Sequence, residues 1–158
     1  MKQLLLFLFA SSLLACTNDK SNKTENTSSE TSSSSSSAHS SSNSPGHWEG
    51  IFSNGMKGAK ISFDISDDGK ELKELTFQGY WRCEGKLDLT TLGPQKSFAI
   101  ENNKVDGVIV EPEGGGATAV RYELHATING DTAEGTFRMN LNGLGCDTYK
   151  LNFTAKKK

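Results

Sequence analysis

The apolar residues divide this 158-residue chain into three stretches. Residues 4–14 are almost wholly apolar, whereas residues 17–45 contain few apolar side chains and many serines. From residue 46 onward apolar residues recur with a period of two. This period is typical of β-strands buried on one face, because successive side chains of a strand point to opposite sides. The pattern predicts a leader (1–15), a linker (16–45) and one all-β domain (46–158).

We expect nine short strands in the domain. The clearest, residues 120–128, has an apolar residue at every second position. The Asn129-Gly130 dipeptide that follows it is typical of a tight hairpin turn. The expected strands are residues 48–53, 60–66 and 72–83, the segments around Leu87–Leu89, Phe98–Ile100 and Val108–Val110, and then residues 120–128, Phe137–Leu141 and Tyr149–Ala155.

The connections between these strands are short, which favours an antiparallel meander of eight or nine strands. One face of the sheet is apolar, so the sheet has to close on itself or fold over to bury that face. A small barrel and a two-sheet sandwich both achieve this. We favour the barrel, with the sandwich as the alternative, because nearly every connection is short enough for neighbouring strands to pair.

The leader begins with Met1-Lys2-Gln3 and continues as the apolar run. One cation, an apolar core of about ten residues and a small residue at its end are the features of a secretory signal peptide. The run is too short to cross a bilayer, which requires about twenty apolar residues. We therefore expect export and removal of residues 1–15.

The end of the leader, Leu13-Leu14-Ala15-Cys16, resembles the lipobox of bacterial lipoproteins. The resemblance implies that Cys16 carries a diacylglycerol on its sulfur and an acyl chain such as palmitate on its amine. Two or three acyl chains hold a protein stably to a membrane. In this family an Asp after the cysteine favours the inner membrane, so Thr17 implies the outer membrane in an organism that has one.

Serine dominates the linker, with an unbroken run at residues 32–37. Such a segment buries too little apolar surface to offset its conformational entropy, so we expect it to be disordered. As a flexible coil it would average about 30 Å from end to end. That distance would separate the domain from the membrane surface.

Two cysteines, Cys83 and Cys146, lie in the expected domain. An even pair in an exported chain predicts a disulfide. A metal site would need a second cysteine pair or histidines at short spacing. The sequence has neither, so we expect no metal.

Charge and motifs exclude several classes of function. The net charge is −2 and the charged residues are scattered without a basic stripe, so nucleic acid is not an expected partner. The sequence contains no Gly-x-Ser-x-Gly, His-Glu-x-x-His or Cys-x-x-Cys motif. Nor does any stretch place a nucleophile beside a base. We therefore expect no catalytic residue, no cofactor and no enzymatic activity.

The domain opens with Gly46-His47-Trp48-Glu49-Gly50. A Gly-x-Trp opening on the first strand is similar to that of calycin barrels, the lipocalin and avidin group. The same opening, with a late cysteine, also resembles small secreted bacterial β domains, which are typically of unknown function. Because nothing beyond the first strand aligns, the resemblance transfers no ligand residue.

These features predict a lipid-anchored envelope protein whose β domain is a non-enzymatic binding or accessory module. Tyr80 and Arg82 fall on the outward face of strand 72–83, and Trp48 lies on the first strand. Exposed aromatic rings stack on sugars or insert into a partner, so these three residues are the candidate ligand-binding residues. The alternatives are a carbohydrate-binding module and an inhibitor of an extracytoplasmic enzyme such as lysozyme, with the acidic loop Glu111–Glu113 facing the basic enzyme. The expected partners are the membrane, through Cys16, and an envelope protein or glycan.

Overall fold

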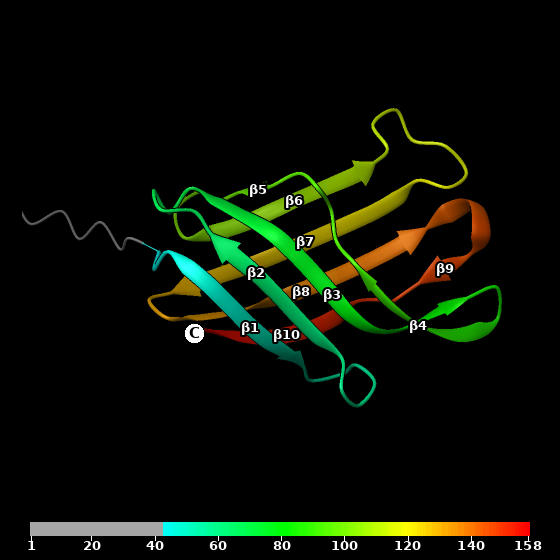
Figure 1. Cartoon of the computed structure of the whole chain (residues 1–158), viewed down its shortest axis with the longest axis horizontal. Helices are drawn as coiled ribbons and strands as arrows, with labels where there is room; N and C mark the ends of the chain where they lie inside the picture. Colours follow the sequence, from blue (N-terminus) through cyan, green and yellow to red (C-terminus); the bar gives the residue numbers. More distant parts are fainter. Residues whose placement is uncertain (1–42) are drawn as a thin grey trace, which may run out of the picture. The chain divides into compact units, whose positions relative to one another are not determined.

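The computed structural model describes residues 43–158, so the predictions for Cys16 and for most of the linker concern residues outside this range. Ten strands and one short 3-10 helix make up the described part (Figure 1). In chain order the elements are β1 (Gly46–Phe52), β2 (Lys60–Ile65), β3 (Glu71–Cys83), β4 (Lys86–Leu92), β5 (Phe98–Ala99), β6 (Lys104–Glu111), β7 (Val120–Asn129), β8 (Thr132–Leu141), η1 (Asn142–Leu144), β9 (Cys146–Asp147) and β10 (Leu151–Lys157).

Six of these strands close into an antiparallel barrel in the order β1-β2-β3-β9-β8-β10. β10 pairs with β1 on one side and with β8 on the other, which completes the ring. β7 and β6 extend the sheet beyond β8, while β4 and β5 pair with β3. The prediction of an all-β barrel is confirmed, although the ring holds six strands rather than eight or nine.

The chain does not run around the barrel as a simple meander. The last strand, β10, returns to lie between β1 and β8, and the two-residue β9 lies between β3 and β8. Short connections favour neighbouring strands in sequence as partners. Here the pairs β1–β10 and β3–β9 join residues far apart in the chain. These pairs close the sheet, and a closed sheet buries its apolar face.

An aromatic cluster fills the barrel interior. Phe77 of β3 stacks on Phe137 of β8 with ring centroids 5.6 Å apart. Phe52 of β1 lies 5.7 Å from Phe77 and 6.3 Å from Phe153 of β10. Four barrel strands therefore meet through rings that alternate with outward polar side chains.

β3 changes its alternation at a bulge. Leu72 and Leu75 are both buried, and Glu74 between them has a φ of 53°. The pairing of β3 with β2 shifts register at the same place. A bulge adds one residue to one strand. The extra residue keeps Phe77 inside the barrel and Tyr80 outside it.

Several apolar residues that marked predicted strands prove to be exposed. On β4, Leu87 is 46% and Leu89 is 65% exposed, because β4 is paired with β3 alone within the described part and lies outside the ring. On β6 the buried residues are Val105 and Ile109, and Val108 is 44% exposed. Val108, one of the two apolar residues that marked this strand, therefore faces outward, and the buried positions are Val105 and Ile109.

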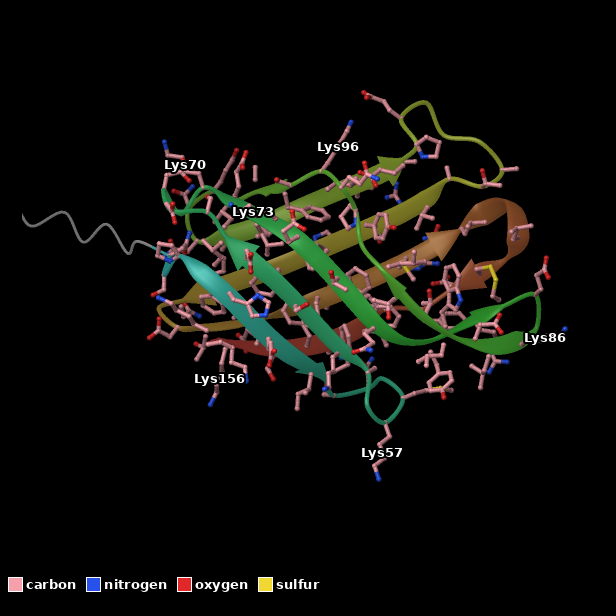
Figure 2. All side chains as sticks on the ribbon, viewed as in Figure 1. Lys57, Lys70, Lys73, Lys86, Lys96 and Lys156 are labelled. Atoms are coloured by element: carbon pink, nitrogen blue, oxygen red, sulfur yellow. A yellow bond between two sulfur atoms is a disulfide. The ribbon has the colours of Figure 1, made fainter. Side chains whose placement is uncertain are left out.

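The predicted disulfide between Cys83 and Cys146 is confirmed (Figure 2). It joins the end of β3 to the short strand β9. Cys146 is buried and Cys83 is half-buried against the core. The covalent bond therefore reinforces the place where the barrel ring is closed by only two residues of β9.

The folded part begins before residue 46. The buried Asn43 donates from Nδ2 to the carbonyl of Gly69 at 2.9 Å. Residues 43–45, which were assigned to the linker, therefore lead into the domain with at least one specific contact.

Candidate functional site

A cleft of about 270 Å³ opens on the outer surface of the barrel. Its walls come from the outward face of β3, from the loop that follows β1 and from the segment between β9 and β10. Two of the three predicted ligand residues, Tyr80 and Arg82, line it together with Tyr149. We call this site the tyrosine cleft; its other principal lining residues are Asn54, Met56, Leu87, Asp147 and Lys150.

Trp48, the third predicted ligand residue, does not face the surface. Its side chain is fully buried, its ring stacks on Phe63 at 5.8 Å, and Nε1 donates to the carbonyl of Ser44 at 3.2 Å. The sequence left its direction open, because either face of the first strand was possible. Trp48 is a core residue and lines no part of the tyrosine cleft.

β3 presents Tyr80 and Arg82 on its outward face. The Tyr80 side chain is 44% exposed. Arg82 pairs across the strands with Leu87 of β4 and with Asp147 of β9. Because cross-strand neighbours point to the same face, Arg82 stands between an apolar side chain and a carboxylate.

Asp147 fixes the backbone that leads into Tyr149. Its Oδ1 accepts hydrogen bonds from the Tyr149 N–H at 2.7 Å and from Arg138 Nε at 3.1 Å. Arg138 Nη2 donates to the second oxygen, Oδ2. The hydrogen bond and charge of Asp147 raise the pKa of the Arg138 guanidinium. Both oxygens of the Asp147 carboxylate therefore already have hydrogen-bond partners within the protein.

Two further side chains hold the segment around Tyr149. The buried Thr148 Oγ1 accepts a hydrogen bond from the Met139 N–H of β8 at 2.9 Å. Asn54 donates from Nδ2 to the Lys150 carbonyl at 3.0 Å and accepts at Oδ1 from the Asn152 N–H at 2.6 Å. Residues on both sides of Tyr149 are thus tied to other parts of the barrel, so the cleft is formed before any ligand arrives.

Tyr149 has an unusual backbone and an exposed ring. Its φ is 57° and its side chain is 60% exposed. A bulky residue in this left-handed region costs on the order of 1–3 kcal/mol and is found most often at functional sites. Because the ring is largely outside the core, the strain is not explained by packing.

The sequence did not single out Tyr149, which it placed at the start of the last strand. The signal that marks its true position is Asp147, two residues earlier. An Asp side chain that hydrogen-bonds the backbone two residues ahead forms a turn, and this turn ends the strand pairing before Tyr149. The contribution of Asn54 was also missed, because its partners lie about a hundred residues away in the chain.

The cleft carries positive charge that has no partner. Arg82 and Lys150 form none of the ion pairs found within residues 43–158. Outside the cleft, Lys60, Lys156, Lys157 and Lys158 line one groove. Lys57, Lys70 and Lys96 lie apart from one another on the surface (Figure 2). No group of three or more potential metal ligands occurs in the described range.

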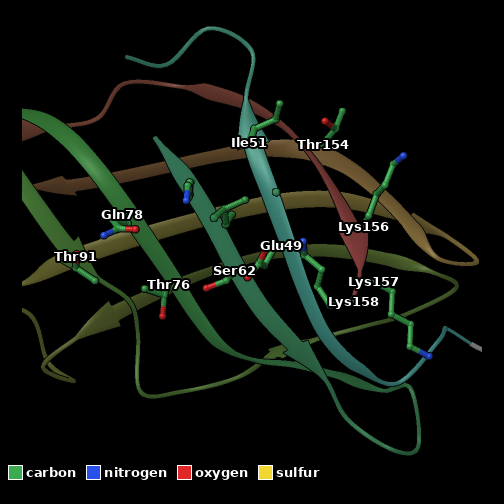
Figure 3. Close-up of a pocket in the computed structure, with 13 residues that line it drawn as sticks. Glu49, Ile51, Ser62, Thr76, Gln78, Thr91, Thr154, Lys156, Lys157 and Lys158 are labelled. Atoms are coloured by element: carbon green, nitrogen blue, oxygen red, sulfur yellow. Dashed lines mark ion pairs between the residues drawn. The ribbon is translucent and has the colours of Figure 1, made fainter. Parts of the chain in front are cut away.

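A larger groove of about 640 Å³ crosses β10, β1, β2, β3 and β4 (Figure 3). Its lining is mostly polar and contains no aromatic ring. Lys156 points away from Gln78 and Thr91 on the far side of the groove (Figure 3). The carboxylate in this groove is that of Glu49, which pairs with Lys158 at 2.9 Å. This hydrogen-bonded ion pair lowers the pKa of Glu49. Four lysines line this groove, but no aromatic ring does, so it offers no surface for stacking.

Two other hollows, of about 600 and 700 Å³, also lack an exposed tyrosine, tryptophan or phenylalanine ring. In the first, His125 Nδ1 lies 2.9 Å from Asp106 Oδ1 on the neighbouring strand, which is a cross-strand polar pair. In the second, the ring of Tyr122 is buried; burial and the charge of Glu111 raise the pKa of Tyr122 to about 12. Neither hollow competes with the tyrosine cleft as a site for stacking.

Comparison with family models, with curated proteins and with solved structures finds no match to this chain. No helix in the described range is long and apolar enough to cross a bilayer.

Proposed function

We propose that this chain is a lipid-anchored protein of the cell envelope whose barrel binds carbohydrate in the tyrosine cleft without catalysing a reaction. One observation carries the proposal. Tyr80 and Tyr149 expose their rings in one cleft whose backbone is already held by hydrogen bonds. A site that is ordered in advance loses little conformational entropy on binding.

The chemistry of the cleft suits a sugar. Tyrosine rings present a flat apolar face on which the C–H face of a sugar ring packs, and a hydroxyl that forms hydrogen bonds. Arg82 and Lys150 add donors beside the rings. Met56 and Leu87 add apolar surface to the lining of the cleft.

The alternative of an enzyme inhibitor is supported less well. It required the carboxylates of the acidic loop Glu111–Glu113 to meet a basic enzyme. Glu111 instead accepts hydrogen bonds from the N–H groups of Gln95 and Lys96 at 3.0 and 3.1 Å, and Glu113 pairs with Lys96 Nζ at 3.1 Å. Unchanged lysis by lysozyme in the presence of the protein would agree with this ranking.

Replacement of Cys16 by serine tests the anchor. We expect the full-length Cys16→Ser variant to leave the membrane fraction, because serine provides no sulfur to which the diacylglycerol can be attached. Fractionation with immunoblotting measures the distribution, and mass spectrometry of the mature N-terminus of the unaltered protein should show the acyl chains. A variant that stays in the membrane fraction would contradict lipidation at Cys16.

Replacement of either exposed ring tests the binding site. We expect Tyr149→Ala and Tyr80→Ala each to weaken retention on a bound polysaccharide by about tenfold or more, which corresponds to at least about 1.4 kcal/mol of lost stacking. The matched control is Ile51→Ala, because Ile51 is 64% exposed but lies in the groove of Figure 3. Affinity electrophoresis over a panel of neutral and acidic polysaccharides measures the effect.

Two results would count against the proposal. One is a lack of retention on every polysaccharide in the panel. The other is an equal loss of binding in Ile51→Ala and in the tyrosine variants, which would show that the cleft is not the site.

A further inference from the structure

We infer that the tyrosine cleft selects an acidic glycan, one that carries a carboxylate or sulfate on or next to the stacked sugar ring. This inference rests on the proposed function and names the class of sugar that the same site takes.

The first step concerns Arg82. Of its two cross-strand neighbours, Leu87 is apolar and Asp147 is the nearby carboxylate. Asp147 is bound by Nε and Nη2 of Arg138 and by the Tyr149 N–H. The Arg82 guanidinium therefore lines the cleft without an anionic partner from residues 43–158.

The second step concerns Lys150. Its backbone carbonyl is held by Asn54, so its place beside Tyr149 is fixed. Its ammonium group, like the Arg82 guanidinium, forms no ion pair with another described residue. The cleft thus holds two unpaired cations, and its one carboxylate is already neutralised by a third cation, Arg138.

The third step concerns the shape of the complementary ligand. A guanidinium is a planar fork that matches a carboxylate or a sulfate through two parallel hydrogen bonds. Arg82 lines the same cleft as Tyr80 and Tyr149, and tyrosine rings favour a flat apolar partner. A sugar acid and a sulfated sugar combine both features within one ring. The net charge of the chain is −2, so the chain as a whole is not basic. A second group of lysines, Lys60, Lys156, Lys157 and Lys158, lines the groove of Figure 3, but that groove has no aromatic ring.

The test uses the full-length lipoprotein in detergent and matched polymers. Polygalacturonate and its fully methyl-esterified form share one backbone and differ only in whether each carboxyl group is a free carboxylate or an uncharged methyl ester. Dextran sulfate and dextran form the equivalent pair for sulfate. Poly-L-glutamate offers carboxylates without a sugar ring, and so represents an acidic protein segment.

We expect at least one acidic polysaccharide to bind about tenfold more tightly than its neutral partner, and the preference to shrink as salt rises. Arg82→Gln should weaken the binding of the acidic polysaccharide about tenfold. Arg82→Lys keeps the charge but lacks the planar fork, so its affinity should lie between those of the unaltered protein and Arg82→Gln. The control is Lys70→Gln, which removes a cation at the end of the barrel away from β4 and β9 (Figure 2). Preference for polygalacturonate would assign a carboxylate, and preference for dextran sulfate would assign a sulfate.

Several outcomes would overturn the inference. Equal binding of an acidic polymer and its neutral partner, lost in Tyr149→Ala, would leave the proposed function standing and remove the charge selectivity. Binding of an acidic polysaccharide that is unchanged in Arg82→Gln would also contradict charge selectivity in the cleft. Binding of poly-L-glutamate as tight as that of polygalacturonate would show that the ring is not recognised. A lack of binding to every polysaccharide would remove the inference and the proposed function together.

Discussion

The Cys83→Ser, Cys146→Ser double variant is expected to lose about 4 kcal/mol of unfolding free energy, close to the chain-entropy value for a loop of this length. The two cysteines are separated by 63 positions, so the bond removes many conformations from the unfolded chain. A small domain is stable by only about 5–15 kcal/mol in total. The melting temperature should therefore fall by roughly 15 °C.

The position of the bond gives a second reason for a large effect. β9 contributes two residues to the ring and pairs with β3 only at Arg82 and Asp147. The disulfide holds β9 to β3 beside this single pair. Its loss should also weaken ligand binding, because Asp147 and the following residues form one wall of the tyrosine cleft.

Thermal and urea denaturation with and without reductant measure the effect. Reductant should destabilise the unaltered protein to the level of the double variant and leave the variant itself unchanged. Equal melting temperatures of the oxidised protein and the variant would contradict the expected contribution.

Phe77→Ala is expected to cost about 3–5 kcal/mol of unfolding free energy. Phe77 is fully buried, and its ring meets Phe137 at 5.6 Å and Phe52 at 5.7 Å. These rings come from β3, β8 and β1. The substitution would leave a cavity where three barrel strands meet, and the rigid strand pairs around it can collapse only partly.

Urea denaturation of the unaltered protein and four variants checks this value. Phe137→Ala should cost a similar amount, and the Phe77→Ala, Phe137→Ala double variant should cost less than the sum, because the two residues share one contact. Leu89→Ala is the matched apolar control, since Leu89 is 65% exposed and its loss should change stability by no more than about 0.5 kcal/mol. A Phe77→Ala protein as stable as Leu89→Ala would show that the aromatic cluster does not hold the barrel together.

Local alternation predicted β7 well. Tyr122, Leu124, Ala126 and Ile128 are all buried, as the period of two required. The hairpin after it is also confirmed, since Asn129 pairs with Thr132 across a two-residue turn in which Gly130 has a φ of 59°. In a long strand such as β7, every second side chain faces the core, so the alternating pattern is unambiguous.

The alternating pattern did not predict which side chains are buried on β6 and β4, two strands outside the ring. On β6 the strand was predicted from Val108 and Val110, whereas in the structure Ile109 between them is buried and Val108 is exposed. On β4 the leucines alternate as in a buried strand, yet no described element covers their face of this edge strand.

The candidate site was half predictable. Tyr80 and Arg82 were placed on the outward face of β3 because the long strand has a clear apolar face opposite them. Trp48 could not be assigned, since its strand is short and glycine-rich. The place of Tyr149 in the cleft could not be predicted, because its exposure depends on hydrogen bonds made by Asp147 and by Asn54, which lies far away in the chain.

The sequence by itself determined the β class, the hairpins and the pairing of Cys83 with Cys146. These follow from periodicity, from turn residues and from the small number of possible cysteine partners. Only the tertiary structure decided that β10 lies between β1 and β8, and that Tyr149 joins Tyr80 and Arg82 in one cleft. Strand closure and the cleft both depend on contacts between distant residues, and a pattern read along the chain records a side chain's neighbours in sequence but not those in space.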